Sequence, residues 1–184
     1  MMSANSSSIE QYLRPGRRAH LVGIGGVSMR PLGLVLRSMG MEITGSDMNA
    51  SVATEELQRS GITVYIGHRE ENIEGADCVI RTAAAHNDNP EIAAARAAGI
   101  PIFERAQAWG HLMRSYKNAI CVAGTHGKTT TTSMLTHIFM QAQRDPTVMI
   151  GGSLPLLGAG HRVGRGDTII LESCEYCNSF LNFF

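Results

Sequence analysis

The chain has 184 residues, which is enough for one large domain or two small ones around a buried core. Sixteen Lys and Arg residues balance sixteen Asp and Glu residues, so charge gives no general attraction to nucleic acid or to an anionic membrane, and we expect a small-molecule partner. The amino terminus lacks the apolar core of a signal peptide, and the sequence has no apolar run long enough to span a membrane. Its four cysteines are too few for a disulfide scaffold. We therefore expect a cytoplasmic protein with reduced thiols.

Short β-branched runs alternate with helical segments in the first part of the chain, as in parallel strands joined by helices. The pattern predicts strands at 19–24, 41–47, 62–67 and 76–84 and helices at 28–40, 50–61 and 88–99, followed by a short strand that runs into a helix over 100–114. Pro90 suits a helix start, and Gly99 suits the position just past the end of the same helix. The polar stretch 115–118 then predicts a boundary, so residues 1–116 are expected to form an α/β, Rossmann-like parallel-sheet domain.

Residues 117–184 open a second unit with a strand, a glycine loop and a helix, and two more strands are predicted at 146–152 and 167–173. The pattern is that of the start of a P-loop α/β domain. It is too short for a closed nucleotide-binding domain, and the apolar ending "SFLNFF" is costly to leave in water. We therefore expect the chain to be the front part of a longer protein and to be inactive alone.

The stretch "GTHGKTT" is the strongest chemical signal. A standard phosphate loop has its first glycine where this sequence has Val122, and here a glycine comes only at Gly124. Gly124 and Gly127 still allow successive backbone N–H groups to face an anion at the start of a helix. Lys128 supplies a cation for the β- and γ-phosphates and Thr129 a hydroxyl for Mg²⁺, so the loop is predicted to bind ATP. The predicted ATP-binding residues are Gly124, Thr125, His126, Gly127, Lys128, Thr129 and Thr130.

An earlier glycine cluster, Gly23, Gly25 and Gly26, follows the first predicted strand, and Asp47 ends the second. The arrangement is similar to a dinucleotide fingerprint, but Ser28 replaces its third glycine. The residues alone indicate that a diphosphate could lie over the loop with Asp47 near a ribose hydroxyl. A glycine turn that serves only strand–helix packing is the alternative.

The shortened loop "GTHGKTTTT", together with "HLVGIGGVSMRPLGLVLRSMGMEITGSD" and "ILESCEYCNSFLNF", resembles the Mur ligases, the ATP-dependent enzymes that build the peptide stem of bacterial cell wall precursors. His126 is similar to the residue found in the member that joins L-alanine to UDP-N-acetylmuramate. The resemblance implies an acyl-phosphate mechanism in which Lys128 and Glu172 are catalytic and Thr129 and Glu172 bind Mg²⁺. It also implies a UDP-sugar site at Gly23, Gly25, Gly26, Val27, Ser46, Asp47, His68 and Thr82.

Several alternatives remain open at this point. The recycling ligase that attaches a tripeptide to the same sugar shares much of the pattern, and a nicotinamide oxidoreductase would use the Gly23 cluster but leave "GTHGKT" unexplained. A sugar-nucleotide-binding module without catalysis is a third alternative. Cys174 and Cys177 form a C-x-x-C, but the sequence offers no second pair at metal spacing to complete a zinc site. Glu175 is a weaker metal candidate than Glu172, and the oligomeric state is left open.

Overall fold

The structure, a computed structural model, describes residues 8–173. Contacts between Cα atoms divide the chain into two compact units, Met1–Ala108 and Trp109–Phe184. The division falls inside α4 (Arg105–Met113), slightly before the polar stretch from which the domain boundary was expected. The assignment of residues 1–116 and 117–184 to two domains stays a prediction.

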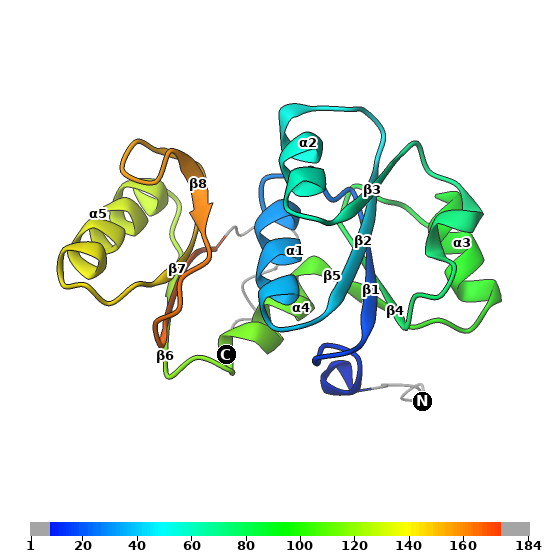
Figure 1. The fold of residues 1–184 in the computed structure, drawn as a ribbon. Coiled ribbons are helices and arrows are strands. Elements are labelled where there is room, and N and C mark those ends of the chain that lie inside the picture. Colours follow the sequence, from blue (N-terminus) through cyan, green and yellow to red (C-terminus); the bar gives the residue numbers. More distant parts are fainter. Residues whose placement is uncertain (1–7, 174–184) are drawn as a thin grey trace. The chain divides into compact units, whose positions relative to one another are not determined.

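The first unit is built on a five-stranded parallel sheet with the strand order β3-β2-β1-β4-β5 (Figure 1). Its strands are β1 (Arg18–Val22), β2 (Glu42–Asp47), β3 (Thr63–Ile66), β4 (Cys78–Arg81) and β5 (Ile102–Glu104). The first strand pairs with β2 on one side and with β4 on the other. The connection after β1 leads to β2 on one side of it, and the connection after β3 leads to β4 on the other side. Connections that diverge in this way leave a crevice at the carboxyl ends of the strands.

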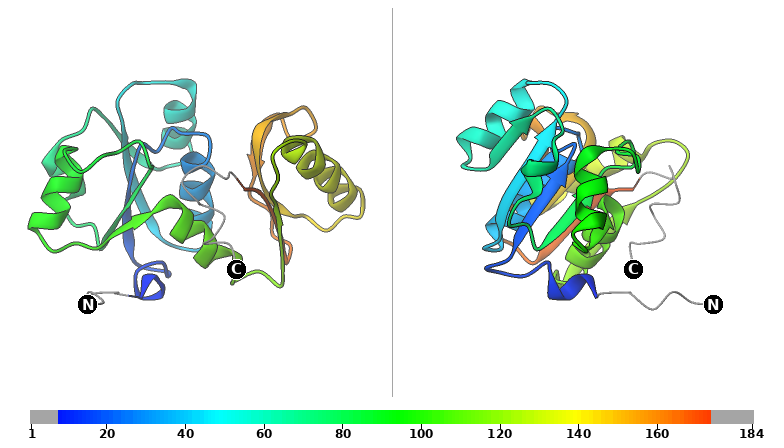
Figure 2. Two further views of the ribbon diagram at one scale, coloured as in Figure 1. Left: turned by 180° about the vertical axis from the view of Figure 1, so that it is seen from behind. Right: turned by 90° about the vertical axis from the view of Figure 1, so that its right-hand side faces the viewer.

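Helices cover both faces of this sheet. Figures 1 and 2 show α1 (Met29–Ser38) and α2 (Val52–Arg59) on one face and α3 (Pro90–Ala97) on the other. Because both faces are covered, burial does not alternate along the central strands, and four successive residues of β1 are buried. On the α3 side the core consists of Val22, Ile73, Val79, Ile92 and Ala95.

Local sequence explains where the helices begin. Ser51 and Thr54 form a reciprocal capping box at the start of α2. The side chain of Asn89 accepts hydrogen bonds from the first backbone N–H groups of α3, and Pro90 occupies its first turn. Two short 3₁₀ helices, η1 (Ile9–Gln11) and η2 (Glu70–Ile73), complete the unit.

After the end of α4, the described residues of the second unit form a four-stranded sheet with the order β6-β9-β7-β8 and the helix α5 (Lys128–Gln141). The strands are β6 (Asn118–Val122), β7 (Thr147–Leu154), β8 (Ala159–Arg162) and β9 (Thr168–Glu172). The strand β8 runs antiparallel to β7 and was not expected from the sequence, in which its four half-buried residues carry no apolar run. Leu135 and Phe139 of α5 pack on a core of Val148, Ile150, Leu154 and Ile170.

Between residues 8 and 173, the structure contains no helix with the length and apolar character needed to cross a membrane.

Candidate functional site

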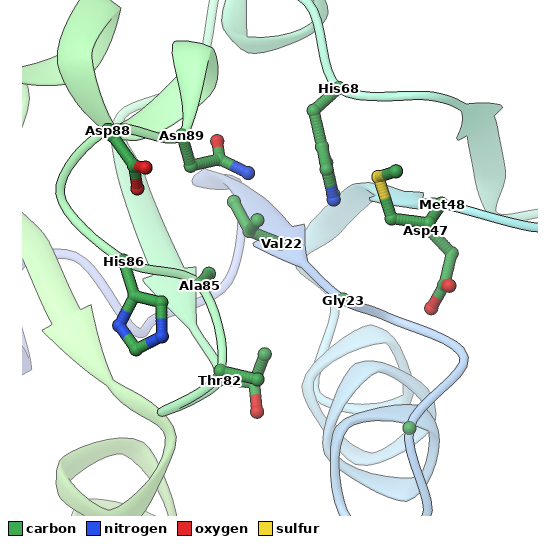
Figure 3. Close-up of a pocket in the computed structure, with 12 residues that line it drawn as sticks. Val22, Gly23, Asp47, Met48, His68, Thr82, Ala85, His86, Asp88 and Asn89 are labelled. Carbon is green, nitrogen blue, oxygen red and sulfur yellow. The ribbon is translucent and has the colours of Figure 1, made fainter.

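A cavity of about 500 Å³ lies at the carboxyl ends of β1, β2 and β4, where the strand order reverses (Figure 3). The crevice outside a switch point of this kind is the place where open α/β sheets bind nucleotides. Twelve residues line it: Val22, Gly23, Gly26, Asp47, Met48, His68, Thr82, Ala84, Ala85, His86, Asp88 and Asn89. Five of the eight residues expected at a UDP-sugar site are among them.

The glycine loop is tied to the end of β2. Gly23 adopts a left-handed backbone with φ of 79°, and both its N–H and that of Ile24 donate to the carbonyl oxygen of Ser46. The backbone N–H of Gly25 donates to Oδ2 of Asp47 at 2.9 Å. One carboxylate oxygen of Asp47 therefore orients the loop, and the Asp47 side chain also borders the cavity.

The opposite wall of the cavity comes from the loop that joins β4 to α3. Asn89 caps α3 through its side-chain oxygen, so its amide group is held at the cavity edge. Sequence reasoning missed His86, Asp88 and Asn89. A polar loop that follows a buried strand and ends in a helix cap was the available signal, since such loops meet at the carboxyl edge of a parallel sheet.

Three residues expected at the UDP-sugar site do not line the cavity. Val27 is 63 % exposed in the glycine loop, and Gly25 contributes through its bond to Asp47. Ser46 is fully buried and donates its hydroxyl hydrogen to Oε2 of Glu91 at 2.6 Å. The Ser46 side chain therefore makes its hydrogen bond inside the protein and does not line the cavity.

The phosphate loop of the second unit lies between β6 and α5. Gly124 and Gly127 have φ values of 146° and 79°, so both occupy the backbone region that favours glycine, as the loop chemistry requires. Gly127 is the residue that precedes the first turn of α5, and Thr125, His126 and Thr130 are exposed around it. The ammonium group of Lys128 donates to the carbonyl oxygen of Gly124 at 2.5 Å, which holds the side chain back over its own loop.

Two oxygen-bearing side chains meet beside this loop. The hydroxyl of Thr129, in the first turn of α5, donates to Oε1 of Glu172 at 2.9 Å, and Glu172 ends the neighbouring strand β9. The second carboxylate oxygen, Oε2, accepts the backbone N–H of Gly151 on β7 at 2.8 Å. The pairing of β9 between β6 and β7 thus brings together two residues that are 43 positions apart in the sequence.

Within residues 8–173, no group of three or more His, Cys, Asp or Glu side chains is placed to hold a metal ion. Cys78 is buried, Cys121 is half-buried, and both are free thiols. The remaining candidates, Cys174, Glu175 and Cys177, lie outside the described residues.

The sequence matches the family model described as "Mur ligase family, catalytic domain" over residues 18–117, more than half of the chain. The chain belongs to the Mur ligase family. A UDP-N-acetylmuramate–L-alanine ligase from Clostridium botulinum (strain Hall) is 48 % identical over 91 % of the chain, and the match covers 37 % of that relative. The chain therefore spans little more than a third of the length of this relative.

Solved structures of Mur ligases have the same fold. UDP-N-acetylmuramate-alanine ligase MurC from Thermotoga maritima matches with a TM-score of 0.77 and 35 % identity, over 84 % of this chain and 37 % of that chain. UDP-N-acetylmuramate:L-alanyl-gamma-D-glutamyl-meso-diaminopimelate ligase from Neisseria meningitides matches with a TM-score of 0.79 and 27 % identity, over 87 % of this chain and 53 % of that chain. The α/β fold expected from the sequence and the resemblance to the Mur ligases are both confirmed.

Proposed function

We propose that this chain carries the nucleotide-sugar site and the phosphate loop of an ATP-dependent ligase that joins L-alanine to UDP-N-acetylmuramate for cell wall synthesis in the bacterial cytoplasm. The observation that carries the proposal is the 48 % identity to a ligase of that name over nearly the whole chain, which includes both glycine loops. The lower identity of 27 % to a ligase that transfers a peptide favours L-alanine over a tripeptide as the incoming group.

In this proposal the cavity of the first unit binds the UDP part of the sugar nucleotide. The glycine loop leads into α1, whose first turn begins at Met29, so the positive end of the α1 dipole would favour a diphosphate over the loop. Asp47 at the end of β2 borders the cavity, and in this proposal its carboxylate accepts hydrogen bonds from ribose hydroxyls. The cavity volume of about 500 Å³ is in the range of small-molecule sites.

The second unit would bind ATP at residues 124–130, with Lys128 close to the transferring phosphoryl group. The hydroxyl of Thr129 and the carboxylate of Glu172 are hard oxygen donors only 2.9 Å apart, and this donor set fits Mg²⁺, which is commonly held by one or two protein oxygens together with phosphates and water. A bound Mg²⁺ would neutralise charge on the phosphate oxygens. The Gly151 N–H fixes the orientation of the Glu172 carboxylate.

The chemistry that follows is activation of a carboxylate. Transfer of the γ-phosphoryl group of ATP to the lactyl carboxylate gives an acyl phosphate and ADP. The amine of L-alanine then attacks the carbonyl carbon, an amide forms, and phosphate leaves. The contribution of Lys128 is electrostatic, because charge spreads over the γ-phosphoryl oxygens during transfer, and the protein needs no covalent nucleophile.

Calorimetric titration of the chain with UDP-N-acetylmuramate, UDP and NADH tests the first half of the proposal. We expect binding of both uridine nucleotides and no tighter binding of NADH. Substitution of Asp47 by Ala should weaken both uridine ligands, because the carboxylate that orients the glycine loop is lost. Tighter binding of NADH than of UDP-N-acetylmuramate would refute the proposal in favour of an oxidoreductase.

A further inference from the structure

A buried carboxylate lies beneath the cavity of the first unit. Glu91, in the first turn of α3, has an exposed fraction of 0 %, yet no sequence signal singled it out. Its Oε2 accepts hydrogen bonds from the Ser46 hydroxyl at 2.6 Å and lies 2.9 Å from Nδ1 of His68. Its Oε1 accepts from Nδ2 of Asn72 at 2.6 Å and lies 3.5 Å from Nε2 of His20. Partners from β1, β2, η2 and the loop after β3 thus converge on one helix residue.

These partners keep Glu91 ionised. Burial alone would raise the pKa of the Glu91 carboxyl, but its polar contacts with His20, Ser46 and Asn72 outweigh burial and hold the pKa below the ordinary value for glutamate. A buried carboxylate without partners is strongly destabilising. The hydrogen bonds from Ser46 and Asn72 therefore compensate the burial of this charge.

The contacts decide which ring nitrogen of His68 carries a proton. Nδ1 lies 2.9 Å from Oε2 of Glu91 and 3.0 Å from Oγ of Ser46. The Ser46 hydroxyl already donates its hydrogen to the same carboxylate oxygen, so both atoms facing Nδ1 present lone pairs. An unprotonated Nδ1 would face two hydrogen-bond acceptors and be repelled by both. Nδ1 therefore carries a proton and donates it.

His68 borders the ligand cavity as well as this network. Its side chain is 14 % exposed, and Figure 3 shows it reaching from the loop after β3 toward the cavity between Val22 and Met48. The loop is held by Asn72, whose Nδ2 donates to the carbonyl oxygen of Gly67 at 3.1 Å in addition to Glu91. With Nδ1 engaged inside the protein, Nε2 is the ring nitrogen left to interact with a ligand.

We propose that Glu91 is a positioning residue that fixes the tautomer of His68, with the ring proton on Nδ1, so that Nε2 offers a lone pair to the cavity. In that form Nε2 accepts a hydrogen bond from an O–H or N–H of the nucleoside, either a ribose hydroxyl or the imide N–H of uracil, and does not donate to the diphosphate. The identity of the ligand rests on the proposed function. The tautomer of His68 does not depend on it.

The first experiment examines the ligand-free protein. Long-range ¹H–¹⁵N spectra of the ¹⁵N-histidine-labelled chain at about pH 8, above the ordinary titration range of histidine, report which ring nitrogens are protonated. The His68 signals are assigned by their loss in His68→Ala. We expect a protonated Nδ1 and an unprotonated Nε2 in the wild type and in Ser46→Ala, which keeps the carboxylate. Protonation of Nε2 in the wild type, alone or together with Nδ1, overturns the proposal.

The second experiment asks whether Glu91 acts through His68. Glu91→Gln should abolish the single fixed tautomer and weaken UDP-N-acetylmuramate binding about threefold to tenfold, the usual worth of one hydrogen bond. In the His68→Ala background, Glu91→Gln should leave the affinity for UDP-N-acetylmuramate unchanged. If Glu91 had a purely structural role, Glu91→Gln would weaken binding equally in both backgrounds, and that result would refute the proposal. Glu71→Gln, at an exposed position nearby, is the matched control and should change neither signal nor affinity.

Two analogues identify the donor on the ligand. If His68 accepts a hydrogen bond from the ribose, 2′-deoxy-UDP should bind more weakly than UDP to the wild type but not to His68→Ala. If His68 accepts a hydrogen bond from the base, N3-methyl-UDP should show this difference between the two proteins. An equal penalty in both proteins for both analogues overturns the assignment of a nucleoside donor. Failure of the wild type to bind any uridine nucleotide would refute the proposed function and leave the spectroscopic test of His68 intact. If Glu91→Gln does not fold, the wild-type and Ser46→Ala spectra still decide the proposal.

Discussion

Replacement of Gly23 by alanine should damage the cavity of the first unit in two separable ways. Gly23 has φ of 79°, a conformation that costs an L-residue about 1–2 kcal/mol. A Cβ atom at this position would also lie 2.7 Å from Cγ2 of Thr82, in the loop after β4, well inside the distance of normal contact. Overpacking of this kind typically costs about 1–3 kcal/mol.

A smaller effect opposes these costs. Alanine restricts the unfolded chain more than glycine does, which contributes about 0.4–1 kcal/mol in favour of the variant. The net expectation is a loss of about 1–5 kcal/mol in the stability of the first sheet. Thr82→Ser removes Cγ2 and keeps the hydroxyl, so in that background only the backbone strain of Gly23→Ala should remain.

Native-state hydrogen exchange of the β1 and β4 amides is the suitable assay, because it measures the opening free energy of this sheet without assuming that both units unfold together. The four proteins of the cycle are the wild type, the two single variants and the double variant. We expect Gly23→Ala to cost about 1–3 kcal/mol less in the Thr82→Ser background. An identical cost in both backgrounds would show that the close approach of Gly23 and Thr82 does not shape the loop.

Three further predictions concern other parts of the chain. In a complete enzyme that contains this chain, Lys128→Ala should reduce turnover far more than UDP-sugar affinity, because the ammonium group acts at the transferring phosphoryl group. Steady-state kinetics measure the turnover, and titration measures the affinity. Equal losses in both would count against the role assigned to Lys128. The N–H of Arg18 and the guanidinium of Arg17 hold the pKa of Asp77 below its ordinary value. A depressed carboxyl pKa stabilises the fold above the unfolded pKa and loses that contribution as pH falls through the folded pKa, so Asp77→Asn should flatten the acid side of the stability profile measured by denaturation below about pH 4. Burial, aided by the neighbouring charge of Asp77, raises the pKa of the Cys78 thiol to about 12, so peptide mapping after iodoacetamide treatment should find Cys78 modified only in unfolded protein.

Local sequence determined most of the elements and both loops. Short β-branched runs predicted the strands of the first sheet, Pro90 marked the start of α3, and the glycines of the phosphate loop have the backbone angles that the loop chemistry requires. These features depend on interactions among residues close in the sequence, such as caps, turns and helix starts. The sequence did not predict strand β8, because its residues are only half-buried and its pairing with β7 has an irregular register.

Only the tertiary structure decided how the polar groups are used. Ser46 was expected at the UDP-sugar site, and the sheet buries its hydroxyl against Glu91. Glu91 itself follows a helix cap and a proline, a position where an exposed acid is commonly found because it favours the positive end of the helix dipole. Its burial depends on how α3 packs against β1, β4 and η2 and on the loop after β3. The positions of those elements are set by hydrophobic packing within the sheet unit. A side chain's partners are fixed by such long-range packing, so the sequence near Glu91 could predict its helix but not its contact with His68.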